Sequence, residues 1–123
     1  MLLLDAITPR LSPFYKNVIV LETTDSTNDF IKKPDYYEVG NIVLSKYQSK
    51  GKGTQGNSFY CEKNKGIYAS FVIDTNQINH MINLIPLMMG IAIARSMMKY
   101  QIAIQLKWVN DVLIDDKKVA GIL

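Results

Sequence analysis

A chain of 123 residues, 48% hydrophobic and 20% charged, is long enough for one compact domain, and its balanced composition excludes disordered and collagen-like classes. The net charge of +3 is too small and too scattered to indicate a nucleic-acid surface. The single Cys61 excludes an internal disulfide and cysteine-based zinc motifs and favours a cytoplasmic location. The longest strictly apolar stretch, residues 84–94, is about half of the roughly 20 residues that span a bilayer, so we expect neither a membrane span nor a secretion signal.

The first predicted elements are a strand, a short helix and a second strand. The β-branched run at residues 18–22 is typical of a strand. Residues 24–28 then supply several side chains that can cap a helix, which we expect to continue through Ile31. After a loop, residues 42–47 predict a second strand, buried on most of both faces.

The polar segment from residue 48 to residue 66 is the longest part of the chain without a predicted element. It contains four of the seven glycines and almost no aliphatic residues. A stretch of this length inside a compact domain is usually functional or disordered. It is therefore the first place to search for a site.

The rest of the chain predicts one strand, one helix and three short strands. Residues 67–74 alternate apolar and small side chains, as a strand does, and residues 83–100 place apolar side chains at helical spacing. Three short strands are expected at residues 102–106, 112–114 and 119–123, with a turn at 115–117 joining the last two. We expect the helix to cover one sheet face and the six methionines to fill the core beneath it. The chain ends within a predicted strand, so we expect it to be part of a longer chain.

The glycine-rich loop at residues 51–56 satisfies G-x-G-x-x-G, and it misses the P-loop motif because Asn57 stands where a lysine is required. Both motifs need a helix that begins at the loop, so that free N–H groups and the helix dipole meet the anion. Here Phe59 and another strand follow instead. The residues favour a phosphate cradle without a helix, with positive charge from Lys50 and Lys52. An ordinary solvated surface loop is the alternative.

A second candidate is the sequence Lys-Trp-Val-Asn-Asp at residues 107–111, which places the only tryptophan between two predicted strands. One interpretation is a core tryptophan flanked by turn-forming residues. The other is a site, because Asn110 and Asp111 lie near two lysines, Lys107 and Lys118. These groups can together hold Mg²⁺, a ribose and a transferring phosphoryl group.

Three segments, taken in order, resemble the biotin protein ligase family. They are Thr-Asp-Ser-Thr-Asn at residues 24–28, Gln-Ser-Lys-Gly-Lys-Gly-Thr-Gln-Gly-Asn at 48–57, and Lys-Trp-Val-Asn-Asp-Val at 107–112 leading into Lys-Val-Ala-Gly-Ile-Leu at 118–123. The resemblance implies an α+β fold, a mixed β-sheet with helices packed on one face. It identifies residues 1–123 as a partial catalytic domain, with no N-terminal DNA-binding domain and no C-terminal barrel domain.

The same resemblance implies a two-step ligation that uses ATP, Mg²⁺ and biotin. The biotin carboxylate attacks the α-phosphate of ATP to give biotinyl-5′-AMP and pyrophosphate. A lysine of a biotin carboxyl carrier protein domain, part of a biotin-dependent carboxylase, then takes the biotinyl group. No DNA and no membrane are expected as partners, and a homodimer is compatible with the resemblance.

The resemblance also assigns the site residues. Polar side chains and closely approaching backbone would bind biotin, at Ser26, Thr27, Gln48, Gly51 and Gly121. The catalytic group would be Lys118, Asp111 and Lys107, with Lys118 offsetting the charge that builds at the α-phosphate and Asp111 as the candidate metal ligand.

The nucleotide is assigned to the glycine loop and the residue before Asp111, namely to Lys52, Gly53, Thr54, Asn57, Phe59 and Asn110. Thr54 departs from the family pattern, since it replaces an arginine expected to bind phosphate, and Phe59 replaces a tryptophan. Cys61 and Glu62 replace a Ser-Pro pair, and Val109 replaces the proline of Lys-Trp-Pro-Asn-Asp. We expect these departures to weaken nucleotide retention without changing the family.

Two alternatives remain open. A lipoate or octanoate ligase-type transferase would share the architecture but use a different glycine motif and a linear acyl pocket, and residues 25–28 favour biotin over it. A non-catalytic, truncated fragment would bind biotin, or nothing, without turnover.

Overall fold

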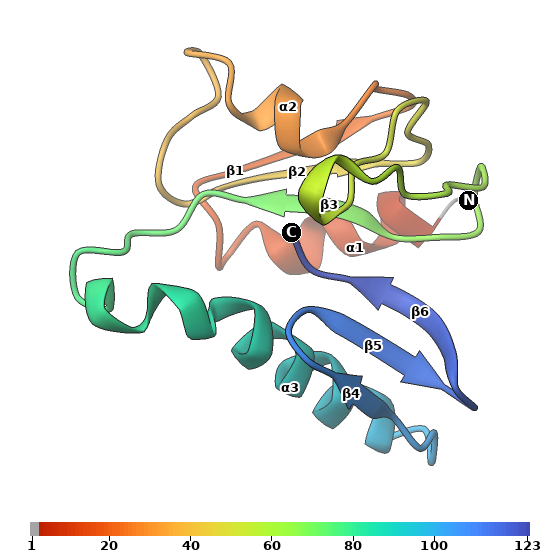
Figure 1. Cartoon of the computed structure of the whole chain (residues 1–123). Coiled ribbons are helices and arrows are strands. Elements are labelled where there is room, and N and C mark those ends of the chain that lie inside the picture. Colours follow the sequence, from red (N-terminus) through yellow and green to blue (C-terminus); the bar gives the residue numbers. More distant parts are fainter. Residues whose placement is uncertain (1–2) are drawn as a thin grey trace. The chain divides into compact units, whose positions relative to one another are not determined.

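The computed structural model describes residues 3–123, with side chains from residue 6 onward, as two compact units, Met1–Asp74 and Thr75–Leu123 (Figure 1). The first unit contains α1 (Leu3–Leu11), β1 (Asn17–Leu21), α2 (Thr27–Ile31), β2 (Asn41–Ser45), the 3-10 turn η1 (Thr54–Gly56) and β3 (Tyr68–Phe71). The second contains the 3-10 helix η2 (Asn79–Leu84), α3 (Ile85–Met98), β4 (Gln105–Lys107), β5 (Asp111–Ile114) and β6 (Lys117–Gly121). The α+β class with mixed strand pairing is confirmed.

The sheet of the first unit is built around β2, which is buried along its whole length. It pairs in parallel with β1 and antiparallel with β3, in the order β1-β2-β3. Burial on both faces explains the nearly continuous apolar run that predicted this strand. Its ends lie within two residues of the prediction.

The two faces of β2 carry different layers. Ile42 and Leu44 form a core with side chains that include Leu11 and Tyr15, which approach from α1 and the turn after it. Residues on the other face alternate with these, and α2 contacts β2 and β3 there. Ile31, buried at the end of α2, belongs to that layer.

Helix α2 begins where the cap-forming run predicts. Ser26 is its N-cap, and the Ser26 hydroxyl oxygen accepts a hydrogen bond from the backbone N–H of Asp29 at 3.4 Å. Thr27 and Ile31, four residues apart, are buried on one side of the helix. This short helix therefore holds its first residue against the sheet.

The second unit is an antiparallel three-stranded sheet, β4-β5-β6, beside α3 (Figure 1). Val112 of β5 is fully buried, and α3 contacts both β4 and β5. Gly90 of α3 lies so close to the sheet that a Cβ there would meet the Leu106 side chain at 3.2 Å. The predicted turn before β6 is confirmed, with Asp115 and Asp116 at φ 49° and 61°, as a tight hairpin requires.

One interpretation and one expectation about burial are wrong. Trp108 is 70% exposed, which excludes the interpretation as a core tryptophan. The expectation that the methionines fill the core is wrong for Met88 and Met98 of α3, which are 52% and 68% exposed. Helical spacing shows that α3 has an apolar side, but only elements packed on that side can bury it. Within the described part of the second unit, β4 and β5 contact only part of α3, and Gly90 is its one buried residue.

The segment Asn79–Met98, which joins η2 to α3, is long and apolar enough to cross a membrane by length and composition alone. This differs from the expectation drawn from the apolar stretch at residues 84–94, because the helical segment includes polar residues on both sides of that stretch. Core helices of soluble proteins also satisfy the criteria of length and composition, so the length and apolar composition of this segment do not assign it to a membrane.

Candidate ligand site

The candidate site of the first unit is centred on a contact between Thr27 and Gln48. The Gln48 carbonyl oxygen Oε1 accepts two hydrogen bonds from Thr27, from the backbone N–H at 2.7 Å and from the hydroxyl at 2.9 Å. Thr27 opens α2, and Gln48 follows β2, where a parallel bridge between Thr24 and Gln48 continues the pairing of β1 with β2. The two motifs that the resemblance assigns to biotin are thus brought together.

This contact continues into residues that sequence reasoning did not assign to a site. The Ser70 hydroxyl, on β3, donates to the Thr27 hydroxyl oxygen at 2.9 Å. On the other side, the Gln48 amide nitrogen Nε2 donates to the sulfur of Cys61 at 3.4 Å. Only the pairing of β2 with β3 places Ser70 beside Thr27, so the local sequence carries no signal for this contact.

Ser26 and Gly51 flank the Thr27–Gln48 pair. Ser26 is 2% exposed, and its hydroxyl oxygen accepts the N-cap hydrogen bond of α2. At Gly51 a Cβ would lie 2.5 Å from the carbonyl oxygen of Phe59 and 2.7 Å from the sulfur of Cys61. The backbone at Gly51 is therefore packed against the chain that returns from the glycine loop, and a larger residue here would have to displace backbone atoms.

The glycine loop closes on itself as a narrow hairpin. The Phe59 N–H donates to the Gly51 carbonyl at 2.8 Å, and the Gly53 N–H donates to the Asn57 carbonyl at 2.7 Å. Thr54 lies in the turn η1, and no α-helix begins at the loop, as expected. The backbone N–H groups of Gly53 and Phe59, which a phosphate cradle would use, are therefore already hydrogen-bonded within the loop.

Charged residues of the loop are tied to the region of α2. Lys52 forms an ion pair with Asp29 at 2.7 Å. Asp25 accepts hydrogen bonds from the Ser49 hydroxyl at 2.6 Å and from Lys50 at 3.2 Å, and these two contacts, the Ser49 bond first, lower the pKa of the Asp25 carboxyl. The positive charges expected to face phosphate are thus already paired with carboxylates.

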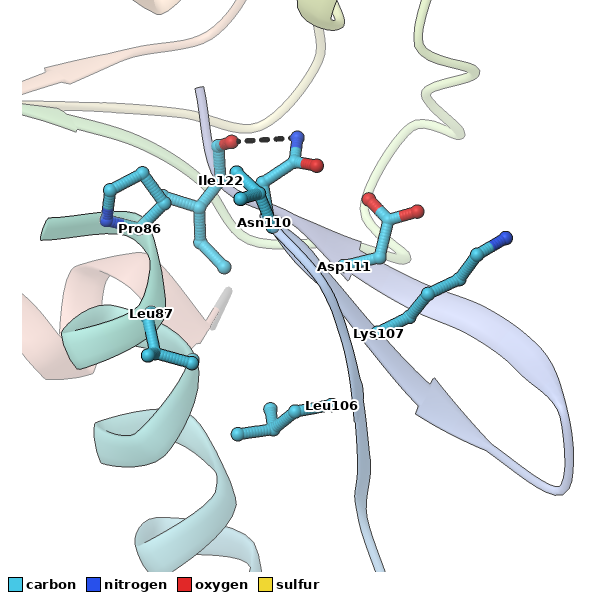
Figure 2. A pocket seen from close by; sticks show the side chains of 9 residues that line it. Pro86, Leu87, Leu106, Lys107, Asn110, Asp111 and Ile122 are labelled. Carbon is cyan, nitrogen blue, oxygen red and sulfur yellow. Dashed lines mark hydrogen bonds between the residues drawn. The ribbon is translucent and has the colours of Figure 1, made fainter. Parts of the chain in front are cut away.

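The candidate residues of the second unit lie on the β4-β5-β6 sheet or in the turn between β4 and β5. Figure 2 shows three of them, Lys107, Asn110 and Asp111. Lys118 forms an ion pair with Asp111 at 2.8 Å, and Lys107 is the cross-strand partner of Asp111. The Asn110 amide donates to the Ile122 carbonyl at 3.0 Å, while the Ile122 N–H donates to the Asn110 carbonyl at 2.9 Å. Asn110 therefore holds the chain just beyond Gly121, where β6 ends.

Beside these residues lies a small hollow between α3 and the sheet, formed by Pro86, Leu87 and Gly90 of α3 together with residues 106–107, residues 109–111 and Ile122. Figure 2 shows Leu87 and Leu106 on either side of it, with the Lys107 ammonium directed away. Its volume is about 10 Å³, roughly the space of one water molecule. It is far too small to hold a nucleotide.

Asp111 is the only carboxylate among the assigned residues, and the described residues contain no cluster of three or more histidine, cysteine or acidic side chains. Mg²⁺ is usually bound by one or two carboxylates together with substrate phosphates. A single carboxylate beside Lys118 fits a metal that is held mainly by ATP. It does not fit a metal held by the protein alone.

A sequence model of the biotin/lipoate A/B protein ligase family matches residues 20–123. The chain belongs to this family. Among curated relatives, the bifunctional ligase/repressor BirA of Escherichia coli is 28% identical over 109 residues, which cover 87% of this chain and 34% of BirA. BirA of Salmonella typhimurium is 29% identical over the same shares. The chain thus spans about a third of these family members.

Solved structures of family members share the fold. The biotin protein ligase of Aquifex aeolicus in complex with biotin and ATP has a TM-score of 0.77 and 31% identity, with 89% of this chain and 46% of that chain covered. The biotin acetyl coenzyme A carboxylase synthetase of Helicobacter pylori has a TM-score of 0.75 at 21% identity, over 86% of this chain and 53% of its own. The matched region is therefore about half of each family structure.

Proposed function

We propose that this chain is part of an ATP-dependent biotin ligase that forms biotinyl-5′-AMP and transfers biotin to a lysine of a biotin carboxyl carrier domain. The observation that carries the proposal is the contact between the buried Thr27 and the half-buried Gln48, in which the two motifs assigned to biotin meet. The relative from Aquifex aeolicus, described in complex with biotin and ATP, supports the same ligands. The expected location is the cytoplasm.

In the proposed first step, a carboxylate oxygen of biotin attacks the α-phosphorus of ATP, and pyrophosphate leaves. Ser26, Thr27, Gln48, Gly51 and Gly121 would hold biotin. Negative charge grows on the α-phosphate oxygens, where the Lys118 ammonium would offset it. The ion pair with Asp111 fixes the direction of the Lys118 side chain before substrate arrives.

The nucleotide would be held by the glycine loop and by Asn110. Lys52, Gly53, Thr54, Asn57 and Phe59 would line it, with Lys107 as a supporting charge. Since Lys52 is paired with Asp29, nucleotide binding would exchange that carboxylate for a phosphate. Asp111 would hold Mg²⁺, which when bound neutralises phosphate charge.

In the second step, the uncharged amine of a carrier lysine attacks the acyl carbon of biotinyl-5′-AMP. AMP leaves with the electrons of the broken anhydride bond, the amine proton is released, and an amide forms. The charged groups of the second unit would remain beside the departing phosphate.

The test is formation of biotinyl-5′-AMP from biotin and α-labelled ATP by the purified chain, followed by thin-layer separation. We expect Lys118→Ala to lower the rate by about 10²- to 10³-fold, since one charge that acts mainly in the transition state is lost, while biotin affinity stays within about twofold. Lys117→Ala, the neighbouring exposed lysine of β6, is the matched control and should keep the rate. Equal loss of rate and of biotin affinity in Lys118→Ala would contradict the role assigned to this lysine.

Two further measurements separate the alternatives. Lipoate should not compete with biotin in a thermal-shift assay, and competition by lipoate or octanoate would favour the transferase. Biotin binding without pyrophosphate release would select the non-catalytic fragment. This outcome is tested because the chain spans only 34% of the length of BirA.

A further inference from the structure

We propose that Ser70 and Cys61 are positioning residues that fix the hydrogen-bonding directions of Thr27 and Gln48. The site then offers a ligand one acceptor, the Thr27 hydroxyl oxygen, and one donor, the Gln48 amide N–H. The inference rests on the proposed function, in which Thr27 and Gln48 contact biotin, and it adds the residues behind them.

The directions at Thr27 follow from which atoms can donate. The Thr27 backbone N–H can only donate, so the Gln48 atom 2.7 Å away is the carbonyl oxygen. That oxygen can only accept, so the Thr27 hydroxyl, at 2.9 Å, gives its single proton to it. The Ser70 hydroxyl must then donate to Thr27 at 2.9 Å, because Thr27 has no second hydroxyl proton.

The other end of the Gln48 amide is fixed in the same way. With its oxygen facing Thr27, the amide directs its nitrogen to the Cys61 sulfur at 3.4 Å, and the sulfur is the acceptor. The thiol proton is then free to donate to the Phe59 carbonyl at 3.5 Å. Cys61 is only 9% exposed, so water cannot readily replace it as the partner of the amide. Ser70 and Cys61 thus stand at the two ends of one ordered chain of hydrogen bonds.

The ordered chain leaves one group free on each central residue. The Thr27 oxygen has given its proton and used one lone pair, so the second lone pair can accept. The Gln48 nitrogen has two protons and uses one, so the second can donate. No described residue takes these two positions. A ligand that matches these two positions carries an N–H, for the Thr27 oxygen, beside a carbonyl, for the Gln48 N–H, as in a cyclic urea. A ligand with two adjacent acceptors would place one of them against the Thr27 lone pair, which would repel it.

The first experiment needs no biotin and measures side-chain order by NMR in the whole chain. In the unsubstituted chain we expect a single χ1 rotamer at Thr27 and a slowly exchanging Gln48 amide. Ser70→Ala should give a Thr27 side chain that averages over several χ1 rotamers, and Cys61→Ala should make the Gln48 amide protons exchange faster. Ser70→Thr should restore the single Thr27 rotamer, and Cys61→Ser should restore the slow exchange at Gln48. Ser12→Ala, which removes an exposed serine hydroxyl bonded to the Thr8 carbonyl, is the matched control. Unchanged order in both alanine variants would overturn the proposal.

The second experiment measures affinity and the direction of the free groups. Ser70→Ala and Cys61→Ala should each raise the Kd and KM for biotin about three- to tenfold, the effect of one hydrogen bond, with kcat unchanged at saturating biotin. A small cyclic urea should shift the Thr27 and Gln48 resonances, whereas the cyclic carbonate of the same ring size should not. Equal shifts, or an unchanged Kd in both variants, would overturn the proposal. If the unsubstituted chain binds no biotin, the proposed function fails, and the NMR experiment still decides the positioning role.

Discussion

At Gly51 the glycine loop folds back against its own beginning, and this close contact gives the glycine a structural role. The carbonyl of Phe59 lies 2.5 Å from the position of a Cβ at Gly51, and the Phe59 N–H bonds to the Gly51 carbonyl. The motif alone predicts a glycine whose backbone approaches a ligand. The structure adds a second constraint, the return of the loop, which acts even without a ligand.

We predict that Gly51→Ala destabilises the chain by about 1–3 kcal/mol, because the added methyl group must displace backbone atoms. Biotin affinity should fall more than tenfold, since the Gln48 amide lies 3.3 Å from the same methyl position. Thermal denaturation and calorimetric titration with biotin would measure the two effects. Gly53→Ala is the matched control, because its nearest contact, the Asn57 carbonyl at 3.3 Å, requires only a small adjustment. Equal effects of the two substitutions would contradict the prediction.

At the scale of elements, Ser26 joins the folding of α2 to ligand binding. Its hydroxyl caps the helix whose first residue, Thr27, bonds to Gln48. A side chain that can still accept from the Asp29 N–H should therefore keep the helix, whatever its effect on a ligand.

We predict that Ser26→Ala lowers stability by about 1 kcal/mol, the usual cost of losing an N-cap. Ser26→Gly should lose only a few tenths of a kcal/mol, because glycine is tolerated at an N-cap and fits a position that is 2% exposed. It should still weaken biotin binding if the hydroxyl contacts biotin. Chemical denaturation and biotin titration of the two variants measure this. Full biotin affinity in Ser26→Gly would mean that Ser26 acts only as a cap.

The segment after β2 is joined to the turn before α2 by a pH-sensitive contact. Asp25 accepts bonds from Ser49 and Lys50, which lower the pKa of the Asp25 carboxyl below its ordinary value of 3.8. A lowered pKa means that the contact stabilises the fold above the ordinary value and is lost as the pH falls through the folded pKa.

We therefore predict that the Asp25 carboxyl titrates below its ordinary value and that Ser49→Ala raises its pKa more than Lys50→Ala does. NMR titration of the carboxyl carbon in the three chains would show this order. Because Asp25 lies at the surface, the effect on global stability should be small, and it should shrink with added salt. A larger shift in Lys50→Ala would contradict the ranking.

Much of the element pattern could be predicted, because hydrophobic spacing reports which side of an element is apolar. The strands near residues 18–22 and 42–47 and the helix within residues 83–100 are confirmed by β1, β2 and α3, with shifted ends. Helix α1 and the 3-10 helix η2 were not predicted. Spacing could not show that Met88 is exposed, since that depends on which elements cover α3. Nor could it place Ser70 beside Thr27, because this contact requires the pairing of β2 with β3.

For the whole molecule, the assigned residues divide between the two units. Ser26, Thr27, Gln48 and Gly51 belong to the first unit, and Lys118 and Gly121 belong to the second. Gly121 is the one residue assigned to biotin that belongs to the second unit, so its assignment is tested by a measurement that follows the whole chain at once.

Hydrogen exchange read by mass spectrometry provides that test. We predict that biotin alone slows exchange at residues 24–31 and 45–53 of the first unit and also at residues 118–122 of the second, since a bound ligand stabilises the backbone that it contacts. ATP added with biotin should extend the protection to residues 52–59 and 107–111. Thr27→Val, which loses the hydroxyl bonded to Gln48, should abolish the effect of biotin in both units while leaving exchange in the unliganded second unit unchanged. Protection by biotin confined to the first unit would remove Gly121 from the site and would mean that the second unit serves only the nucleotide.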